Sequence, residues 1–534
     1  YLDAIIDSNA EARAFQSAGS RNSWNFKNLL NYRNTFGKHR LDVLAGVEAS
    51  KNTYRVNNIR GTGFSNSTLK TPQDAAVVES YYNESAYTFL SVLGRVNYDF
   101  DGKYLLSVTA RRDGSSRFGR NKQWGLFPAV SLGYNISEEP FFDSIKETVN
   151  YLKLRASYGV SGNAEIGNYA YVSTYSQANY NGASGITLAN IGDDELGWES
   201  ALQTNIGLSM QMFDGKFRLD VDVYEKLTQD LLLPYPVTVL SGLTQVTTNL
   251  GEIKNEGIEV MAGVTLVDKD DFTWDAEVTY AWNTNEVIDI GDNAEGIDIP
   301  GFGTTSIYIG KPIGIQTIPV WVGVEPATGQ DIYQALDGRN LTVAEAVAEF
   351  GSLNNFLNSN QVPFGNPYPD FTGGFSSRLT FKNWSVSTLW NFSVGQTYIA
   401  SGEQIQGKFA YGSMNITPLR SQLGRWRNPG DIVRVAQVTT DPTIWGRTTE
   451  YVSEIDYLRM RDLTIAYRFD IEDSSLVKSV DLYAKFTNFL TFTNATGAMY
   501  DPENYVRGGN LNLMDKWKQV PQAKTVNLGI NIKL

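Results

Sequence analysis

The sequence LSVLGRVNYDFDGKYLLSVTARRDGSSRFGRNKQWGLFPAVSLGYNI, residues 90–136, contains three runs in which apolar and polar residues alternate. Alternation with a period of two is typical of a β-strand that has one apolar and one polar face. A tight turn at Asp101-Gly102-Lys103 separates the first two runs, and a polar loop, 112–123, separates the second run from the third. The stretch therefore predicts three consecutive antiparallel strands of roughly ten residues each.

Similar alternating runs recur from Trp24 to the C-terminus, and they predict an all-β chain of about 15 antiparallel strands. The connections alternate between short and long, and aromatic residues flank the short turns, as Phe100 and Tyr104 do. Short turns on one side, long loops on the other side and an aromatic girdle are typical of a transmembrane β-barrel. A string of soluble β-sandwich domains is the alternative, because its strands also alternate.

In a transmembrane barrel the apolar face of each strand meets lipid and the polar face lines the lumen. The central positions of the apolar faces carry no Lys or Arg, which fits this arrangement because a cation there costs about 2–4 kcal/mol at the bilayer midplane. The charged strand residues that we expect to face the lumen are Arg95, Arg111, Arg155, Arg218, Asp220, Asp222, Asp275 and Glu277.

The composition excludes several classes of protein. A net charge of −13 argues against nucleic acid as a partner, because phosphate binding needs a basic surface. The chain has no Cys and a single His, His39, which excludes thiolate metal sites and metal sites built on several His. A Ser–His–Asp triad would have to use His39, which falls in a short turn. We therefore expect no metal, no cofactor and no enzymatic activity.

Seven segments in order resemble the SusC/RagA-type TonB-dependent transporters of the bacterial outer membrane. They are GRVNYDFDGKYLLSVTARRDGSSRFGRNKQWGLFPAVSLGYNISEEPFF (94–142), YLKLRASYGVSGNAEIGNY (151–169), LGWE (196–199), NLGEIKNEGIEV (249–260), RWRNPGD (425–431), IDYLRMRDLTIAYRF (455–469) and TNFLTFTNATGAMYDPE (487–503). The resemblance covers residues 24–534, and several long motifs in the same order are a specific signal.

The resemblance implies a barrel of about 22 strands, a size typical of plugged outer-membrane transporters. This chain would supply the C-terminal portion, residues 24–534. The N-terminal plug and the first strands, which are needed for closure, are expected outside this sequence. Residues 1–23 would then be an extracellular loop. The long extracellular loops are expected at 51–86, 161–197, 227–250, 284–370, 396–454 and 490–523, with no membrane strand in 284–370.

The resemblance also implies energised import of a nutrient, either an oligosaccharide or a peptide, as the barrel of a SusCD-like complex. The expected partners are a SusD-like surface lipoprotein lid, the TonB complex acting through the plug, and the outer-membrane lipid. A passive porin-type channel and a surface glycan-binding protein or adhesin are the alternatives. Loop aromatics could contact the substrate or simply pack the loops together; the candidates are Tyr175, Tyr180, Trp321, Tyr368 and Trp445.

Overall fold

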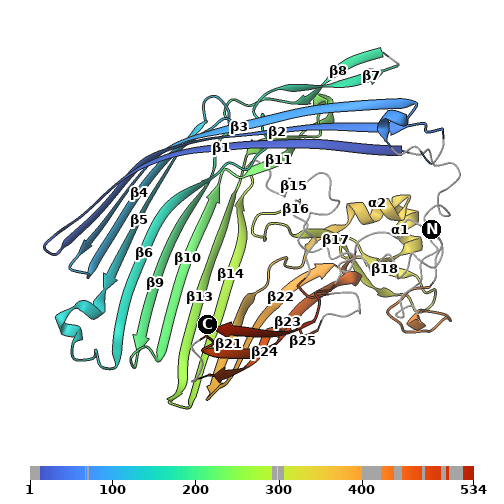
Figure 1. Cartoon of the computed structure of the whole chain (residues 1–534). Coiled ribbons are helices and arrows are strands. Elements are labelled where there is room, and N and C mark those ends of the chain that lie inside the picture. The colour runs from blue at the N-terminus through green and yellow to red at the C-terminus, as the bar shows by residue number, and fades with distance from the viewer. Residues whose placement is uncertain are drawn as a thin grey trace.

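The computed structural model of the chain describes all residues except 1–12, 66–67, 69–70, 182, 292–296, 299–305, 400–422, 438–447, 472–475, 495–500, 504–520 and 534. One antiparallel sheet of 16 strands makes up most of this part (Figure 1). Each long strand pairs with the long strands before and after it in the chain, and the short β25 (Thr491–Thr493) pairs with β23 beside this path. The predicted all-β class with antiparallel strands is confirmed.

The strands of the path are β1 (Arg13–Phe36), β2 (His39–Thr62), β3 (Val77–Phe100), β4 (Tyr104–Ser115), β5 (Trp124–Asn135), β6 (Val149–Asn163), β9 (Glu199–Met212), β10 (Phe217–Gln229), β13 (Glu252–Lys269), β14 (Phe272–Asp289), β21 (Phe371–Phe381), β22 (Trp384–Ile399), β23 (Val452–Asp470), β24 (Ser479–Thr487) and β26 (Thr525–Lys533). They form a curved wall whose end strands, β1 and β26, are not paired with each other in the described residues (Figure 1). Connections such as 37–38, 101–103 and 213–216 lie at one end, which we call the short-turn end. The described parts of connections such as 164–198, 290–370 and 400–451 lie at the other, the long-loop end.

The turn at 101–103 illustrates why the hairpins close where they do. Asp101 and Gly102 have φ angles of 58° and 70°, in the left-handed region that Asp and Gly tolerate best. The Gly102 N–H donates to Asp99 Oδ1 at 2.8 Å, which holds the turn from within the first strand. The register that follows pairs Phe100 with Tyr104 and places both rings on one face of the sheet.

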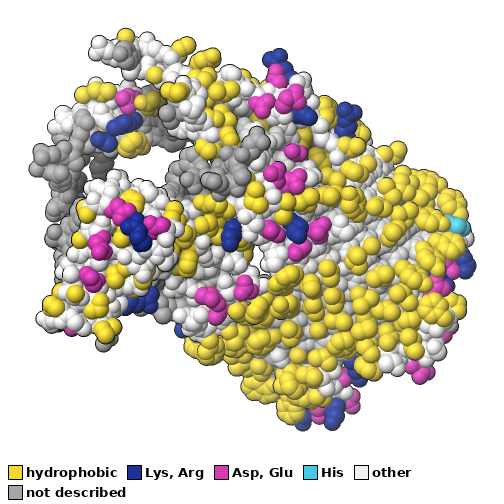
Figure 2. Space-filling model, turned by 180° about the vertical axis from the view of Figure 1, so that it is seen from behind, with side chains coloured by type: hydrophobic (Ala, Val, Ile, Leu, Met, Phe, Trp, Pro, Cys, Tyr) yellow, Lys and Arg dark blue, Asp and Glu magenta, His cyan; other side chains and the backbone are white. Residues whose placement is uncertain are grey.

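The apolar face of the sheet is not covered by any other part of the described chain. Leu126 is 63% exposed, Leu132 58% and Val92 52%, although side chains of this kind form the core of a water-soluble protein. Figure 2 shows a broad, nearly continuous apolar surface over the back of the wall. An apolar band of this extent fits contact with hydrocarbon and does not fit a string of soluble sandwiches.

The predicted loops 1–23 and 51–86 are wrong in part. Residues 13–23 belong to β1, β2 continues to Thr62, and β3 begins at Val77, so the connection between β2 and β3 covers only 63–76. β1, β2 and β3 pair with one another in unbroken register over 24 residues each. Towards the long-loop end these strands carry polar side chains on both faces, so the sequence there lacks the alternation that identifies a strand. The backbone ladder holds them together, and side-chain pairs such as Arg55 with Glu84 at 3.1 Å add to it.

The other predicted loops contain structure of their own. A hairpin of β7 (Thr174–Tyr180) and β8 (Ala183–Asn190) lies within 161–197. A second hairpin, β11 (Leu232–Pro236) with β12 (Gln245–Asn249), lies within 227–250. The strand ends also differ from the predicted limits by a few residues, because β6, β10, β14 and β22 each continue into the predicted loop.

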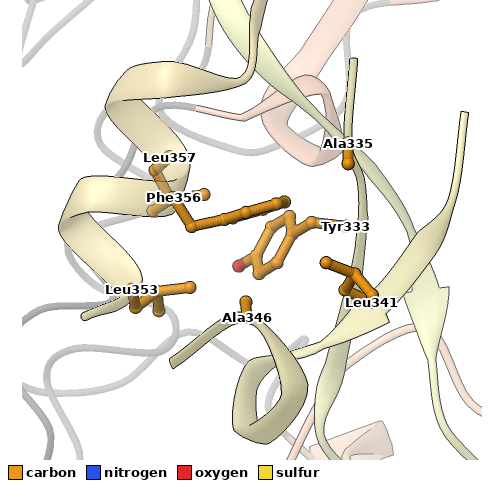
Figure 3. Close-up of a cluster of buried hydrophobic side chains, with 7 residues drawn as sticks. All are labelled: Tyr333, Ala335, Leu341, Ala346, Leu353, Phe356 and Leu357. Atoms are coloured by element: carbon orange, nitrogen blue, oxygen red, sulfur yellow. The ribbon is translucent and has the colours of Figure 1, made fainter. Parts of the chain in front are cut away.

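A compact substructure occupies the connection between β14 and β21, which was predicted as the loop 284–370. It contains β15 (Ile297–Asp298), β16 (Ser306–Ile307), β17 (Gln316–Val324), β18 (Asp331–Gln334), β19 (Asn340–Thr342), α1 (Val343–Phe350), α2 (Leu353–Ser359) and β20 (Gln361–Phe364), and none of these strands joins the wall. Helix α1 begins with a capping box between Thr342 and Glu345. The Tyr333 and Phe356 rings meet in the core between the helices and the small sheet (Figure 3). No helix in the described residues has the length and apolar character needed to cross a membrane.

A cation placed on either face of β5 tests which face meets hydrocarbon. Val130 lies on the apolar face and Ser131 on the polar face of the same strand. We expect Val130→Lys to destabilise the folded protein in lipid vesicles, lowering its free energy of unfolding by about 2–4 kcal/mol. Ser131→Lys should change the folding free energy by less than about 1 kcal/mol, because its side chain can be hydrated. Equal losses for the two full-length variants in a denaturant titration would contradict this assignment of the faces.

Candidate functional site

The polar face of the wall carries an ion pair that spans three strands. Arg155 of β6 and Asp222 of β10 are both opposite Gly207 of β9 in register. Arg155 Nη2 donates to Asp222 Oδ2 at 2.8 Å, directly across this glycine. A Cβ on Gly207 would lie 2.4 Å from Asp222 Oδ1 and 2.7 Å from Arg155 Nη2. Because Gly207 has no side chain, Arg155 and Asp222 can approach each other above it.

This ion pair borders a shallow polar depression on the same face of the sheet. The depression extends from β2 to β10 near the short-turn end, and its lining includes Arg40, Asp99, Lys153, Arg155 and Asp222. Both signs of charge are present, so a polar solute meets hydrogen-bond donors as well as acceptors there. No group of His, Asp or Glu in the described residues has the arrangement of a metal site.

Arg111 is fixed by three partners, also on the polar face. Its Nε lies 2.6 Å from Asp113 Oδ1, its Nη1 lies 3.4 Å from Glu48 Oε2, and its Nη2 donates to Ser91 Oγ at 2.9 Å. Glu48 comes from β2, Ser91 from β3 and Asp113 from β4. The guanidinium thus ties three strands together below the long-loop end.

The structure places the remaining predicted lumen charges on this face as well. Asp220 accepts a hydrogen bond from Ser209, and Asp275 accepts one from Thr265 Oγ1 at 2.6 Å. Arg218 and Glu277 are both opposite Gly263 in register, so they share one row across β10, β13 and β14. Arg95 is exposed between Leu44 and Thr109. The predicted charges therefore share one face of the wall, but they are distributed over several strands and do not form a single cluster.

The predicted loop aromatics that the structure describes, Tyr175, Trp321 and Tyr368, lie in three different surroundings. Tyr175 is 66% exposed on the β7–β8 hairpin. Trp321 packs against the core around Tyr333, and its Nε1 donates to Asp331 Oδ1 at 2.8 Å. Tyr368 is partly buried, and this burial raises the pKa of its hydroxyl. Trp321 therefore packs the loop core, and the role of these aromatics as substrate contacts stays a prediction. The side chain of Tyr180, and Trp445 as a whole, lie outside the described residues.

The two longest connections fold against each other at the long-loop end. Trp426, from the segment RWRNPGD, donates from its Nε1 to the Pro326 carbonyl at 2.9 Å, and the Gly430 N–H donates to the same oxygen at 2.7 Å. A Cβ on Gly329 would lie 2.4 Å from the Trp426 ring, so this close approach requires glycine. The Trp321 N–H donates to Thr449 Oγ1 at 2.9 Å. Residues from 290–370 and 400–451 thus form one packed lobe.

A buried ion network attaches the last long connection to the polar face of β23, and sequence reasoning did not find it. Arg459 Nη2 lies 2.7 Å from Asp501 Oδ1, and Arg459 Nη1 lies 2.5 Å from Glu503 Oε2. Arg461 pairs with Glu503 as well, and Asn391 Nδ2 donates to Glu503 Oε1 at 2.7 Å. Arg459, Asp501 and Glu503 are only 3%, 6% and 8% exposed.

The partners of Asp501 in this network stabilise its charged form. Burial by itself raises the pKa of Asp501, but hydrogen bonds from Arg459 and from the N–H groups of Gln522 and Glu503 outweigh it and lower the pKa overall. Such networks add little net stability, but separating one partner from the others is costly because it leaves a buried charge unpaired. The network therefore fixes where 501–503 lie. The motif TNFLTFTNATGAMYDPE contained both carboxylates, but their partners are some forty residues earlier, which a local pattern cannot reveal.

Residues 3–489 match the family model described as TonB dependent receptor-like, beta-barrel. The chain belongs to this family. TonB-dependent receptor P39 of Formosa agariphila is 29% identical over 95% of this chain, which corresponds to 52% of that protein. TonB-dependent receptor SusC of Bacteroides thetaiotaomicron is 28% identical over 67% of this chain and 36% of its own length. The chain spans about half the length of the first two curated relatives that it matches.

The RagAB peptide transporter is a solved structure with the same fold. It superposes with a TM-score of 0.83 at 23% identity, over 98% of this chain and 57% of that one. The RagAB peptide importer in its open-open state gives a TM-score of 0.82 over 99% of this chain and 56% of that one, also at 23% identity. At this level of identity the likeness shows the fold of this TonB-dependent receptor barrel, and the substrate has to be argued separately.

Closing the gap at Gly207 should uncouple Arg155 from Asp222. A double-mutant cycle with Arg155→Met and Asp222→Leu should give a coupling energy of about 0.5–1 kcal/mol, as expected for a half-exposed pair. In the Gly207→Val background the coupling should fall to near zero, because the side chain occupies the space between the charges. Gly94→Ala is the control, since its Cβ would meet nothing nearer than the Leu44 carbonyl at 3.8 Å. An unchanged coupling in Gly207→Val would disprove this role for the glycine.

Removing Arg459 should release the last connection. Arg459→Met leaves the carboxylates of Asp501 and Glu503 buried with one partner fewer, which costs about 3–5 kcal/mol locally. We expect faster proteolysis within 488–524, whereas Arg468→Met should not change the rate because Arg468 is half exposed. The lowered pKa of Asp501 means that its contribution is present above the ordinary value of 3.8 and is lost only at more acid pH. Wild-type resistance that already declines between neutral pH and pH 5 would contradict this account.

Proposed function

We propose that this chain forms the C-terminal part of the barrel wall of a TonB-dependent importer in the bacterial outer membrane. The cargo is a nutrient, either an oligosaccharide or a peptide. The observation that carries the proposal is the match of residues 3–489 to the TonB-dependent receptor barrel family. The exposed apolar face and the charged opposite face support it, because they suit a wall between lipid and a polar path.

Completion of the wall belongs to this proposal. Strands β1 and β26 are the ends of the sheet in the described residues. In hydrocarbon each unpaired backbone N–H or C=O costs several kcal/mol. The proposed barrel is therefore completed by further strands, to about 22 in all. A plug inside this barrel would couple it to TonB. The polar depression between β2 and β10 offers charged groups for the plug or for the passing substrate.

The long-loop end is the proposed extracellular side. The packed lobe, the β7–β8 hairpin with Tyr175 and the other long connections would receive the substrate there, together with a SusD-like lipoprotein lid. The relatives named SusC and RagAB support this assembly. Their cargoes are not transferred to this chain, because the two identities are 28% and 23%. A passive porin and a surface adhesin are the competing functions.

Uptake of a labelled oligosaccharide or peptide by cells that carry the full-length protein separates the three functions. An energised importer predicts uptake that falls to background when TonB is deleted, together with co-purification of a surface lipoprotein. A porin predicts uptake that persists without TonB and steady conductance in planar bilayers. An adhesin predicts ligand held on the cell surface with no uptake in either strain. Either of the last two results would refute the proposal.

A further inference from the structure

Two cations lie on the apolar face of the sheet, towards its long-loop end. Lys51 of β2 is directly opposite Trp24 of β1, and Trp24 is 53% exposed. Arg112 of β4 lies on the same face, and its guanidinium carbon is 5.1 Å from the centre of the Trp124 ring. We call these four residues, Trp24, Lys51, Arg112 and Trp124, the cationic rim. Each cation in it has a tryptophan beside it.

The position of Trp124 beside Arg112 is built into the sheet. Trp124 is opposite Gly114 in register, and a Cβ on Gly114 would lie 2.9 Å from the indole ring. The glycine lets the ring lie flat on the sheet, where its face can meet the guanidinium. Tryptophan is also the residue most suited to the boundary between hydrocarbon and lipid headgroups.

Neither cation forms an ion pair with any residue that the structure describes. Arg111, the sequence neighbour of Arg112, points to the other face and has two carboxylate partners there. Glu84 lies further out than Lys51 on the same face, and it is held by Arg55 at 3.1 Å. Lys51 interacts with the Glu84 carboxylate only through its electrostatic field. Arg112 is the cation of the rim that has no described carboxylate near it, so it presents positive charge to whatever surrounds the wall.

The depth of Arg112 restricts what can neutralise it. Arg112 follows Tyr104 of the short-turn girdle by eight residues, about 26 Å along a strand. With a strand tilt near 40° this is roughly 20 Å along the membrane normal, within an apolar band of about 25 Å. Val92 and Leu126 flank Arg112 in register and are 52% and 63% exposed. The side chain must therefore extend outward to the headgroup layer, where phosphate is the available anion.

The positive charge of the cationic rim is confined to strands β1–β5. On β10 and β13, Glu225 and Glu256 are opposite each other on the same face, and Lys254 pairs with Glu256 at 3.3 Å. That sector is acidic, with its cation already neutralised. A general preference for cations at the membrane boundary would place them on β10–β13 as well as on β1–β5. The unpaired cation on β1–β5 alone fits a specific site for an anion there.

We propose that the cationic rim binds the phosphate of an anionic lipid headgroup in the outer leaflet. Arg112 supplies a planar donor pair for the phosphate oxygens beside the Trp124 indole. Lys51 and Trp24 lie further out, because Lys51 is opposite Thr88 whereas Arg112 is opposite Val92 of the same strand, and they supply a second charge and a second indole to the outer part of the headgroup layer. The proposal rests on the membrane placement given under the proposed function and adds a lipid ligand to it. It predicts that lipid is held more tightly on β1–β5 than on β10–β13.

Native mass spectrometry of the full-length protein in detergent tests the site. After delipidation the protein is titrated with phosphatidylglycerol, with phosphatidylethanolamine or with inorganic phosphate. We expect tighter binding of phosphatidylglycerol than of phosphatidylethanolamine. Arg112→Gln and Lys51→Gln should each weaken phosphatidylglycerol binding about fivefold, the value of one cation near an anionic surface. Arg112→Lys should keep only part of the affinity, because lysine keeps the charge but loses the planar donor pair. Arg55→Gln, which removes a paired arginine further out, is the matched control.

Three results would overturn the proposal: equal affinity for the two lipids, unchanged binding in Arg112→Gln with Lys51→Gln, or full competition by inorganic phosphate, which would indicate an anion site without lipid. The import assay keeps this test separate from the proposed function. If Arg112→Gln and Lys51→Gln import normally and bind lipid like the wild type, the lipid-site proposal is wrong but the proposed import function still stands. If the full-length protein does not fractionate with the outer membrane, the proposed import function is wrong.

Discussion

The backbone hydrogen-bond ladder between successive strands is the interaction on which the rest of this structure depends. The ladder continues where the alternation of apolar and polar side chains is lost, as in the parts of β1, β2 and β3 towards the long-loop end. Each of these strands is 24 residues long. The ladder also fixes which residues share a face, because a shift of one residue would exchange the apolar and the polar sides. In hydrocarbon the ladder has a further consequence: the edges at β1 and β26 need partners, which supports the proposal that more strands complete the wall.

Charges on the polar face follow from this register. Arg155 and Asp222 meet across β9 because the residue between them in register is Gly207. This pair is partly exposed and contributes little stability, so it leaves a polar surface that a solute can contact. The network of Arg459 with Asp501 and Glu503 is different, because it is buried and fixes the course of a connection. One face thus carries both accessible charges and a rigid attachment.

Sequence reasoning located the parts of the fold that depend on local signals. The turn at Asp101-Gly102-Lys103 and the strands β4 and β5 are where the alternation placed them, whereas β3 contains the predicted run but already begins at Val77. It failed for residues 13–23 and 51–62, whose strands are polar on both faces. It also missed Asp501 and Glu503, because their arginines lie in a different strand. Contacts between distant segments, such as Trp426 with Pro326, decide how the loops pack, and no local pattern records them.

The central claim is that the two faces of this wall meet lipid and water. Because the chain has no cysteine, single-cysteine variants along β5 can report on each position separately. The full-length protein in outer-membrane vesicles would be treated with a membrane-impermeant maleimide after substitution at Ala129, Val130, Ser131 or Leu132. We predict that Ala129→Cys and Ser131→Cys react and that Val130→Cys and Leu132→Cys stay protected. Equal reaction at all four positions would contradict a wall between hydrocarbon and a polar lumen.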